Sequence, residues 1–290
     1  MLFSSPITPF IFKNRFYHIK RDDLLDKEFN GNKARKFYYF LKNDFPNIKK
    51  LISFGSNQSN AMYSLSVLAK MKNWEFIYYT NHISSYLKNN PSGNYLNALK
   101  NGMKIVEINL PSEKLREYVL SLKENSTLII EEGGRNKESK EGIKILANEI
   151  NEYAKKNNLK VFLPSGTGTT AYFLSKYLDV NVITTPCVGD SRYLKKQFSL
   201  LGGGKTPTIL EPKKKYHFGK LYRELYTLWL ELKNAGIEFD LLYDPIGWDT
   251  ILYYDLKNIL YIHQGGLNGN VTMKQRYEYF LKKTIDFIEK

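Results

Sequence analysis

The sequence predicts an α/β protein built on parallel sheet. Two observations carry this prediction: short apolar, β-rich runs alternate with amphipathic helical stretches, and this alternation continues over all 290 residues without a linker, repeat or low-complexity stretch. Such alternation is typical of strands joined by helices that cover the faces of a parallel sheet. With 42% hydrophobic residues, the chain can bury the core of two modest domains or one large one.

The individual elements follow from local patterns. Strands are expected at 51–54, 75–79, 104–108, 160–163, 239–242 and 259–262. Helices are expected at 61–71, 144–155 and 221–233, and from about Thr170 onward. In the first of these helices Met62, Leu65 and Leu68 recur on one face, which is helical spacing. Pro164 is expected to break the strand that precedes it.

Composition excludes several classes of protein. Charged residues make up 25% of the chain, which is a globular average, so the chain is not mainly disordered. No apolar run reaches the roughly 18 residues of a membrane helix. The first twelve residues lack the basic flank of a signal peptide, and we expect a cytoplasmic protein. The single cysteine, Cys187, excludes a disulfide framework and a cysteine-based zinc site, and the histidines are scattered, so no metal is expected.

The formal net charge of +14 suggests an anionic partner. Proteins that bind nucleic acid usually cluster Lys and Arg and interleave aromatic residues. Here nearly all the excess is scattered Lys, and the only dense run is 213–215. We therefore expect a solvated basic surface that attracts anionic ligands, with neither nucleic acid nor membrane as a partner. An affinity for nucleic acid that falls steeply with salt concentration would be needed to support a nucleic-acid-binding function.

The segment 30–36, Asn-Gly-Asn-Lys-Ala-Arg-Lys, holds Lys33 in a tight turn. Crowding by Arg35 and Lys36 is expected to lower the pKa of Lys33, as an amine that forms a Schiff base requires. A basic helix start on the protein surface is the alternative interpretation.

Two further segments lie between an expected strand and an expected helix. Residues 56–60, Ser-Asn-Gln-Ser-Asn, either cap the helix or present donors to a carboxylate or phenolate oxygen at its positive end. Residues 165–170, Ser-Gly-Thr-Gly-Thr-Thr, are typical of a phosphate cradle made of backbone N–H groups and hydroxyls, although a flexible turn with a threonine cap has the same letters. No Lys-Ser/Thr follows these glycines, so the segment is not a nucleotide P-loop.

The segment 263–266, His-Gln-Gly-Gly, follows the expected strand 259–262. Loops at the carboxyl ends of parallel strands are where α/β proteins place ligands. A lone histidine at a strand end is more often structural than catalytic.

Taken in order, these segments resemble the family of D-cysteine desulfhydrase and 1-aminocyclopropane-1-carboxylate (ACC) deaminase, which are fold-type-II, tryptophan synthase β-like pyridoxal-phosphate enzymes. The resemblance runs from Thr8 to Gly269. The matching segments are Lys20-Arg21-Asp22-Asp23 with KRDD, 30–36 with GGNKxRK, Gln58-Ser59-Asn60 with QSN, 132–136 with xGGSN, and 166–170 with GTGTT.

Three positions depart from the family's pattern. Asn30 replaces the first glycine of GGNK, and Asn tolerates left-handed backbone. The family's LDPVYTGK is degraded. Aligning 239–244 with it puts Tyr243 at the tyrosine, whereas matching Asp244 and the following proline to DP would put Gly247 there; we prefer the first alignment. Gln264 stands where desulfhydrases tend to have Thr and ACC deaminases Leu.

The resemblance implies a fold, a cofactor and partners. The fold has two open, twisted, mainly parallel sheets flanked by helices, with a smaller α/β domain, 38–146, inserted in a larger domain formed by 1–37 and 147–290. The cofactor is pyridoxal 5'-phosphate, the substrate is a small amino acid, and the protein is a homodimer.

The resemblance also implies residue roles. Lys33 carries the cofactor and acts as the base at Cα, Ser59 contacts the substrate carboxylate, and Tyr243 is a second proton-transfer group. The cofactor-binding residues are Lys33, Lys36, Asn60, Gly166, Thr167, Gly168, Thr169, Thr170, Asp244 and Gln264. Among them, Asn60 lies at the cofactor phenolate and Asp244 near the pyridine nitrogen.

The implied reaction is removal of ammonia from a small amino acid. We prefer β-elimination of sulfide from D-cysteine, which gives pyruvate, sulfide and ammonia, because the polar Gln264 suits a thiol. Ring opening of ACC to 2-oxobutanoate and ammonia is the alternative. The YTGK segment is altered, so a third possibility is a family member that binds the cofactor but does not catalyse a reaction.

Overall fold

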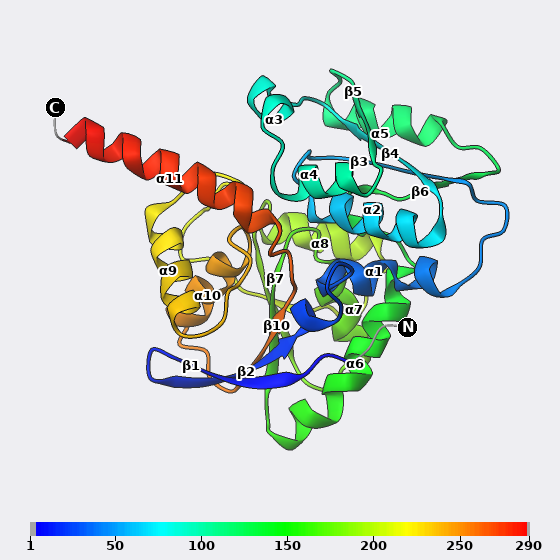
Figure 1. The fold of residues 1–290 in the computed structure, drawn as a ribbon. Helices are drawn as coiled ribbons and strands as arrows, with labels where there is room; N and C mark the ends of the chain where they lie inside the picture. The colour runs from blue at the N-terminus through cyan, green and yellow to red at the C-terminus, as the bar shows by residue number, and fades with distance from the viewer. Residues whose placement is uncertain (1–3, 289–290) are drawn as a thin grey trace.

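Two sheets organise the chain (Figure 1), in a computed structural model that describes residues 4–288, with side chains described as far as residue 282. The larger sheet has six strands in the order β1-β2-β10-β7-β8-β9. Its strands are β1 Ile7–Phe12, β2 Arg15–Arg21, β7 Lys160–Ser165, β8 Val182–Pro186, β9 Thr208–Ile209 and β10 Ile259–His263. All neighbours run parallel except β1 and β2, which form an antiparallel pair.

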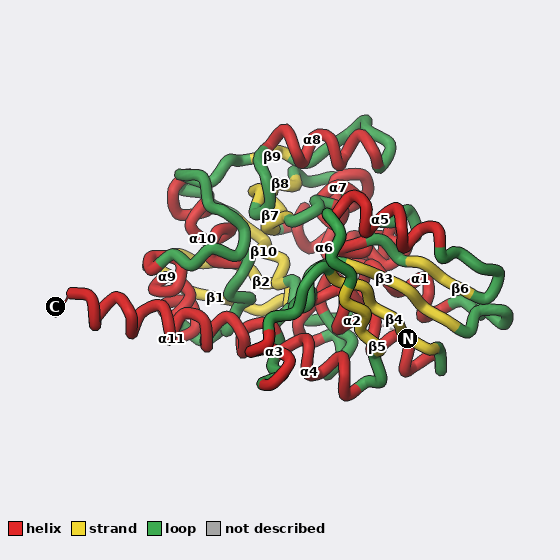
Figure 2. Tube along the Cα trace, turned by 90° about the horizontal axis from the view of Figure 1, so that it is seen from above, coloured by secondary structure: helices red, strands yellow, loops and turns green. Residues whose placement is uncertain are grey.

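The smaller sheet has four parallel strands in the order β5-β4-β3-β6. Its strands are β3 Lys50–Phe54, β4 Glu75–Thr80, β5 Lys104–Glu107 and β6 Thr127–Ile129. The helices are α1 Gly31–Lys42, α2 Asn60–Lys72, α3 Ser85–Asn89, α4 Gly93–Lys100, α5 Ser112–Ser121, α6 Ser139–Lys156, α7 Thr169–Tyr177, α8 Ser191–Leu200, α9 Arg223–Asn234, α10 Asp244–Tyr253 and α11 Gly269–Ile288, with short 3-10 turns η1 Asp22–Leu24 and η2 Glu132–Gly134. Figure 2 shows the two sheets side by side, with α11 running away from the body of the protein.

The α/β class and the mainly parallel sheets predicted from the sequence are confirmed. The strands expected at 51–54, 75–79, 104–108 and 259–262 are present to within a residue, and the four expected helices are all present. Within residues 4–288, no helix combines the length and the apolar character needed to cross a bilayer.

Each sheet has its own apolar core. Phe37 of α1 and Leu65 of α2 pack together over the smaller sheet, whereas Leu146 of α6 packs with the larger one. Trp248 of α10 fills the other face of the larger sheet. The domain boundaries that we predict, 37/38 and 146/147, fall inside α1 and α6, and they remain predictions.

Pro164 does not break the strand, contrary to the prediction: β7 continues through it to Ser165, and Pro164 pairs with Thr185 of β8. Its carbonyl oxygen faces the β10 side, where it accepts a hydrogen bond from Gln264 Nε2 at 2.8 Å. The ladder between β7 and β10 has already ended at Phe162. The missing amide hydrogen of Pro164 therefore removes no ladder bond, which is why a proline fits here.

The strand expected at 239–242 is also absent. Asp240 Oδ1 accepts hydrogen bonds from the backbone N–H groups of Leu242 and Tyr243, at 2.8 and 2.7 Å. This side-chain turn competes with extended backbone and leads directly into α10, which has a proline in its first turn. An apolar run with strand-like composition thus becomes a helix entry because of one carboxylate.

Candidate active site

The N-terminus of α1 is docked against the loop that follows β10. The Asn32 N–H donates to the carbonyl oxygen of Gln264 at 2.9 Å. Gly31, at φ +65°, passes so close to the same carbonyl that any β-carbon would overlap it. Glycine alone meets both requirements. This docking fixes the direction in which the first turn of α1 presents Lys33.

Lys33 and Lys36 reach the same point. Their Nζ atoms each donate to the carbonyl oxygen of Gly133, at 3.1 Å in both cases. The two lysines are three residues apart in a helix and so lie on one face of it. The structure thus brings together the two lysines that the resemblance assigns to the cofactor.

Burial lowers the pKa of Lys33 to about 8, and the carboxylates of Asp240 and Glu132 oppose this shift without cancelling it. The cause predicted from the sequence, crowding by Arg35 and Lys36, is wrong: burial lowers the pKa, and the Arg35 guanidinium turns away into ion pairs on another face of the helix. An amine with this pKa is about one-tenth neutral at pH 7, whereas an ordinary lysine is almost fully charged. A sufficient fraction of Lys33 is therefore neutral and nucleophilic for the amine to form a Schiff base with a carbonyl compound.

The rate at which a carbonyl cofactor attaches to Lys33 is expected to rise with pH and to level off above about pH 8, because only the neutral amine attacks. Asp240→Asn removes a negative charge that favours the ammonium form of Lys33. The inflection in the variant's curve of attachment rate against pH should therefore lie at lower pH than in the wild type. An asparagine oxygen can still accept the two backbone bonds that Asp240 accepts. Stopped-flow absorbance across pH 6–10 measures this, with Glu224→Gln, an exposed carboxylate paired with Lys214, as control. An unmoved inflection in Asp240→Asn would contradict the assignment.

The start of α2 carries Ser59 and Asn60. Ser59 Oγ accepts the Ala61 N–H at 3.1 Å and caps the helix, and the Ser59 hydroxyl also bonds the Tyr78 phenol. Asn60 Oδ1 accepts a hydrogen bond from Asn94 Nδ2 at 2.7 Å, and Asn60 Nδ2 lies 3.5 Å from Asp240 Oδ2. Both predicted residues therefore sit at the positive end of a helix, and Asn60 also faces Asp240.

The loop 166–170 joins β7 to α7 in the way that an anion cradle requires. Gly168 is the N-cap of α7 at φ +72°, and a β-carbon on it would lie 2.6 Å from the Phe198 ring. A β-carbon on Gly166 would lie 3.3 Å from the ring of Tyr243. Because neither glycine has a side chain, a ligand can approach the backbone N–H groups at the start of α7.

The hydroxyls of this loop fit a phosphate. Thr167 Oγ1 and Thr169 Oγ1 lie 3.1 Å apart. Thr170 Oγ1 is buried and has no hydrogen-bond partner among the described residues. A buried hydroxyl without a partner costs free energy unless a ligand satisfies it. The helix start, the open glycines and this hydroxyl together suit a phosphate oxygen.

Gly168→Val is expected to raise the dissociation constant for a phosphate-bearing cofactor by at least about tenfold, because the β-branched side chain meets Phe198 and is strained at positive φ. Fluorescence titration measures the affinity. Gly236→Val is the matched control: Gly236 also has positive φ but faces open space at the end of α9. Equal affinities in the wild type and Gly168→Val would remove this loop from the site.

Tyr243 lies against the loop 166–170, with its ring beside Gly166. Burial raises its pKa, so the phenol stays protonated at neutral pH. Gly247, the residue that the other alignment would place here, lies inside α10 against the Tyr261 hydroxyl instead. The position of Tyr243 beside the candidate phosphate loop favours the alignment that we preferred.

Asp244, predicted to lie near a pyridine nitrogen, is turned into the core. Its Oδ1 accepts from the Tyr261 hydroxyl at 2.5 Å and its Oδ2 accepts from the Asp240 N–H at 2.9 Å. The carboxylate that approaches Lys33 and Asn60 is that of Asp240. Burial raises the pKa of Asp240 to about 6, and burial beside Asp240 raises that of Asp244 further.

Gln264 is held at both ends of its amide. Nε2 donates to the Pro164 carbonyl at 2.8 Å, and Oε1 accepts from Asn32 Nδ2 at 3.1 Å. Gln264, Lys33 and Asn60 line a polar cavity of about 370 Å³ between the loop that precedes α1, the start of α2 and the loop after β10. The amide of Gln264 therefore shapes a wall of the cavity and links the α1 and β7 segments.

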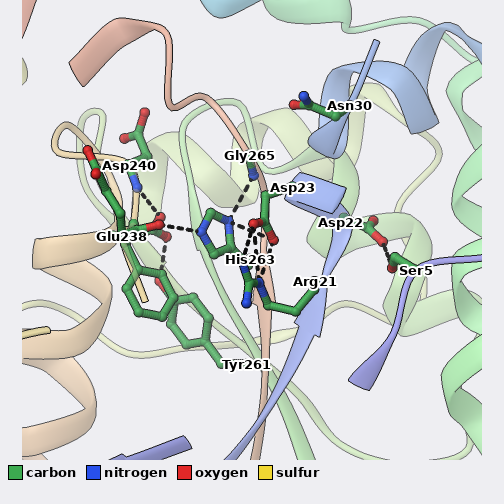
Figure 3. A network of polar contacts seen from close by, with 12 residues as sticks. Ser5, Arg21, Asp22, Asp23, Asn30, Glu238, Asp240, Tyr261, His263 and Gly265 are labelled. Atoms are coloured by element: carbon green, nitrogen blue, oxygen red, sulfur yellow. Dashed lines mark hydrogen bonds and ion pairs between the residues drawn. The ribbon is translucent and has the colours of Figure 1, made fainter. Parts of the chain in front are cut away.

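Figure 3 shows how His263 fixes the loop after β10. His263 Nδ1 accepts the Gly265 N–H at 3.1 Å, so the ring proton is on Nε2, which donates to the Glu238 carbonyl at 2.9 Å. Asp23 lies 3.7 Å from Nδ1 and pairs with Arg21. Burial lowers the pKa of His263 and keeps it neutral. Its role is structural.

Sequence reasoning missed four groups at this site: the carboxylates of Asp240 and Glu132, the carbonyl of Gly133 and the amide of Asn94. Three of them lie in segments that the sequence analysis had identified, but the sequence of those segments does not predict which group faces Lys33. Asn94 lies at the start of α4 with no local signal, and only packing brings it to Asn60.

Comparison of the sequence with models of known families finds no match, and comparison with curated proteins finds none either. Solved structures do match. An ACC deaminase homologue is 21% identical, with 94% of this chain and 93% of that chain covered and a TM-score of 0.78. Threonine deaminase isoform 2 from Solanum lycopersicum is 13% identical, with 91% and 80% covered and a TM-score of 0.65. A hydrogen sulfide-producing enzyme from Fusobacterium nucleatum is 13% identical, with 90% and 93% covered and a TM-score of 0.63.

The chain has the fold of the fold-type-II enzymes. The fold class implied by the resemblance is thereby confirmed. At these identities the likeness extends to the fold-type-II architecture, and the chemistry rests on the residues of this chain.

Proposed function

We propose that the protein removes ammonia from a small amino acid with pyridoxal 5'-phosphate as cofactor. The observation that carries the proposal is the position of Lys33. It is a half-buried lysine with a lowered pKa that lines a cavity and is linked through Gly133 to the candidate phosphate loop. A lysine on the protein surface keeps its ordinary pKa and contacts no such cavity, so this combination of features favours a functional amine.

The residues of the site suit this cofactor. Lys33 would hold it covalently, and residues 166–170 would bind its phosphate through backbone N–H groups and hydroxyls. Asn60 would donate to its phenolate side, and Gln264 would fix the neighbouring wall of the site. When bound, the cofactor supplies an electron sink for the bond that breaks at the substrate's Cα.

The protein's own groups would handle protons and orientation. Lys33, released from the cofactor by substrate, would take the proton from Cα, because a pKa near 8 suits a base at neutral pH. Ser59, at the positive end of α2, would bind the substrate carboxylate. Tyr243 keeps its proton at neutral pH and would serve as the acid or the second proton-transfer group.

We propose D-cysteine as the preferred substrate. Asn94 lines the cavity and carries an Oδ1 that is buried and has no partner among the described residues. A substrate with a polar hydrogen, such as a thiol, would satisfy it, whereas an apolar cyclopropane would not. A buried polar group left unpaired costs about 1–3 kcal/mol, which corresponds to roughly 5- to 150-fold in kcat/KM. The amide of Gln264 is already bonded at both ends, whereas the amide of Asn94 is bonded only through Nδ2.

ACC is the second candidate, and the structural match to an ACC deaminase homologue favours it. Sulfide release from D-cysteine and ammonia release from ACC, measured on the same holoenzyme, decide between the two. We expect a higher kcat/KM for D-cysteine, and L-cysteine and D-serine complete the comparison. The reverse ranking would contradict the choice of substrate. A bound cofactor with no turnover of any of them would point to the non-catalytic alternative.

A further inference from the structure

The surroundings of Gly133 bring three basic side chains together. Lys33 and Lys36 both bond its carbonyl, and Arg135 follows two residues later. Burial lowers the pKa of Lys36 well below its usual value, and the nearby charges of Lys33 and Arg135 lower it further. Like charges that converge in a buried region repel each other unless an anion joins them.

The carboxylates near these side chains are Asp240 and Glu132, which act on Lys33, and Glu131, which pairs with Arg135. Burial raises the pKa of Glu132, which disfavours its charged form. Glu131 accepts from Arg135 at 3.3 Å, but its carboxylate is shared with Arg116, which donates to it through two nitrogen atoms. Lys36 has no carboxylate partner among the described ion pairs. Lys36 is therefore the member of this group without a carboxylate partner among the described residues, and Arg135 shares its carboxylate with Arg116.

Arg135 is tied to the loop 166–170 from two sides. A β-carbon on Gly133 would lie 3.2 Å from the Thr167 methyl, so the loop that carries Arg135 packs directly on the candidate phosphate loop. Arg135 Nη1 also donates to Gln197 Oε1 at 2.5 Å. Gln197 lies on α8 next to Phe198, the residue that packs over Gly168. The guanidinium is thus bonded to a helix that packs against Gly168, and it follows a turn that packs against Thr167.

We propose that Arg135, together with Lys36, forms a cationic wall that binds the phosphate group of the cofactor. This inference rests on the proposed function. It concerns a feature of this chain's own, because the segment that it resembles, xGGSN, has a serine where Arg135 stands. A guanidinium presents several donors in a fixed plane and binds phosphate more strongly than a neutral hydroxyl does. Arg135 is then a binding residue for the phosphate and not only a link between two loops.

The test compares two ligands, pyridoxal 5'-phosphate and pyridoxal, which differ in the phosphate alone. Dissociation constants are measured by fluorescence titration for the wild type, Arg135→Gln, Arg135→Lys and Gln197→Ala. Arg135→Gln should weaken the phosphorylated ligand about tenfold or more and change pyridoxal by less than about twofold. Arg135→Lys keeps the charge and should retain most of the preference.

Gln197→Ala is the matched control, because it removes the hydrogen bond that holds the guanidinium and leaves the charge in place. It should affect the preference for the phosphorylated ligand less than Arg135→Gln does. Inorganic phosphate should compete with pyridoxal 5'-phosphate more weakly in Arg135→Gln than in the wild type. Urea unfolding of each variant checks that the fold is retained.

The possible failures are distinguishable. If the wild type binds pyridoxal as tightly as pyridoxal 5'-phosphate, the phosphate site of the proposed function is wrong. If the wild type prefers the phosphate but Arg135→Gln keeps that preference, only the role of Arg135 is overturned. If Gln197→Ala and Arg135→Gln weaken both ligands equally, Arg135 holds the loop in place and does not bind phosphate.

Discussion

Lys33→Ala is expected to abolish covalent attachment of pyridoxal 5'-phosphate and all turnover. Lys33 combines a pKa of about 8 with a position at the cavity and beside Gly133, which packs on the candidate phosphate loop. The visible absorbance band of the holoenzyme, removable by borohydride, should be absent from the variant, and the peptide labelled by reduction in the wild type should contain Lys33.

Lys36→Ala is the control that makes this test sharp. Lys36 Nζ lies at the same distance from the Gly133 carbonyl as Lys33 Nζ, so proximity alone does not distinguish the two amines. Lys36→Ala should weaken cofactor binding and still give a borohydride-fixed label. A label on Lys36, or a band that survives in Lys33→Ala, would show that the attachment site is wrong.

Arg35→Ala is expected to lower the free energy of unfolding by about 3–5 kcal/mol, because the buried carboxylate of Asp22 and the partly buried one of Glu149 lose the guanidinium that joins them. Arg35 has no exposed surface. It donates to both oxygens of Asp22, at 2.8 and 3.0 Å, and to both oxygens of Glu149, at 2.7 and 2.8 Å. Urea unfolding measures the loss. Lys13→Ala, which breaks an exposed pair with Glu231, should cost less than about 1 kcal/mol.

The loss should depend on pH in a definite direction. Burial by itself raises the pKa of Glu149, but Arg35 and Lys20 more than offset this and hold it below the usual value. A carboxyl with a lowered pKa stabilises the fold above its unfolded pKa, about 4.3, and that stabilisation disappears as the pH falls through the folded pKa. The difference between wild type and Arg35→Ala should therefore be largest near neutral pH and shrink below about pH 4. A difference that is constant with pH would show that lost packing, not lost charge, explains the variant.

Much of the fold was predictable because its signals are local. The strand at 51–54 and the helix at 61–71 are apolar runs whose period and ends need no distant contact. The two errors came from single residues whose effect depends on neighbours. Pro164 is tolerated because the β10 ladder ends before it, and Asp240 turns an apolar run into a helix entry.

The sequence by itself determined which segments form the candidate site, because turn glycines, helix-start hydroxyls and the Asn-Gly-Asn-Lys segment keep their chemistry wherever the chain runs. Only the tertiary structure decided which groups meet there. Asp240 faces Lys33 while Asp244 bonds Tyr261 in the core, and two lysines share the Gly133 carbonyl a hundred residues away. The lowered pKa of Lys33 likewise arises from burial and not from its basic neighbours in sequence. Burial and side-chain direction depend on contacts between segments that are distant along the chain, and no local pattern encodes them.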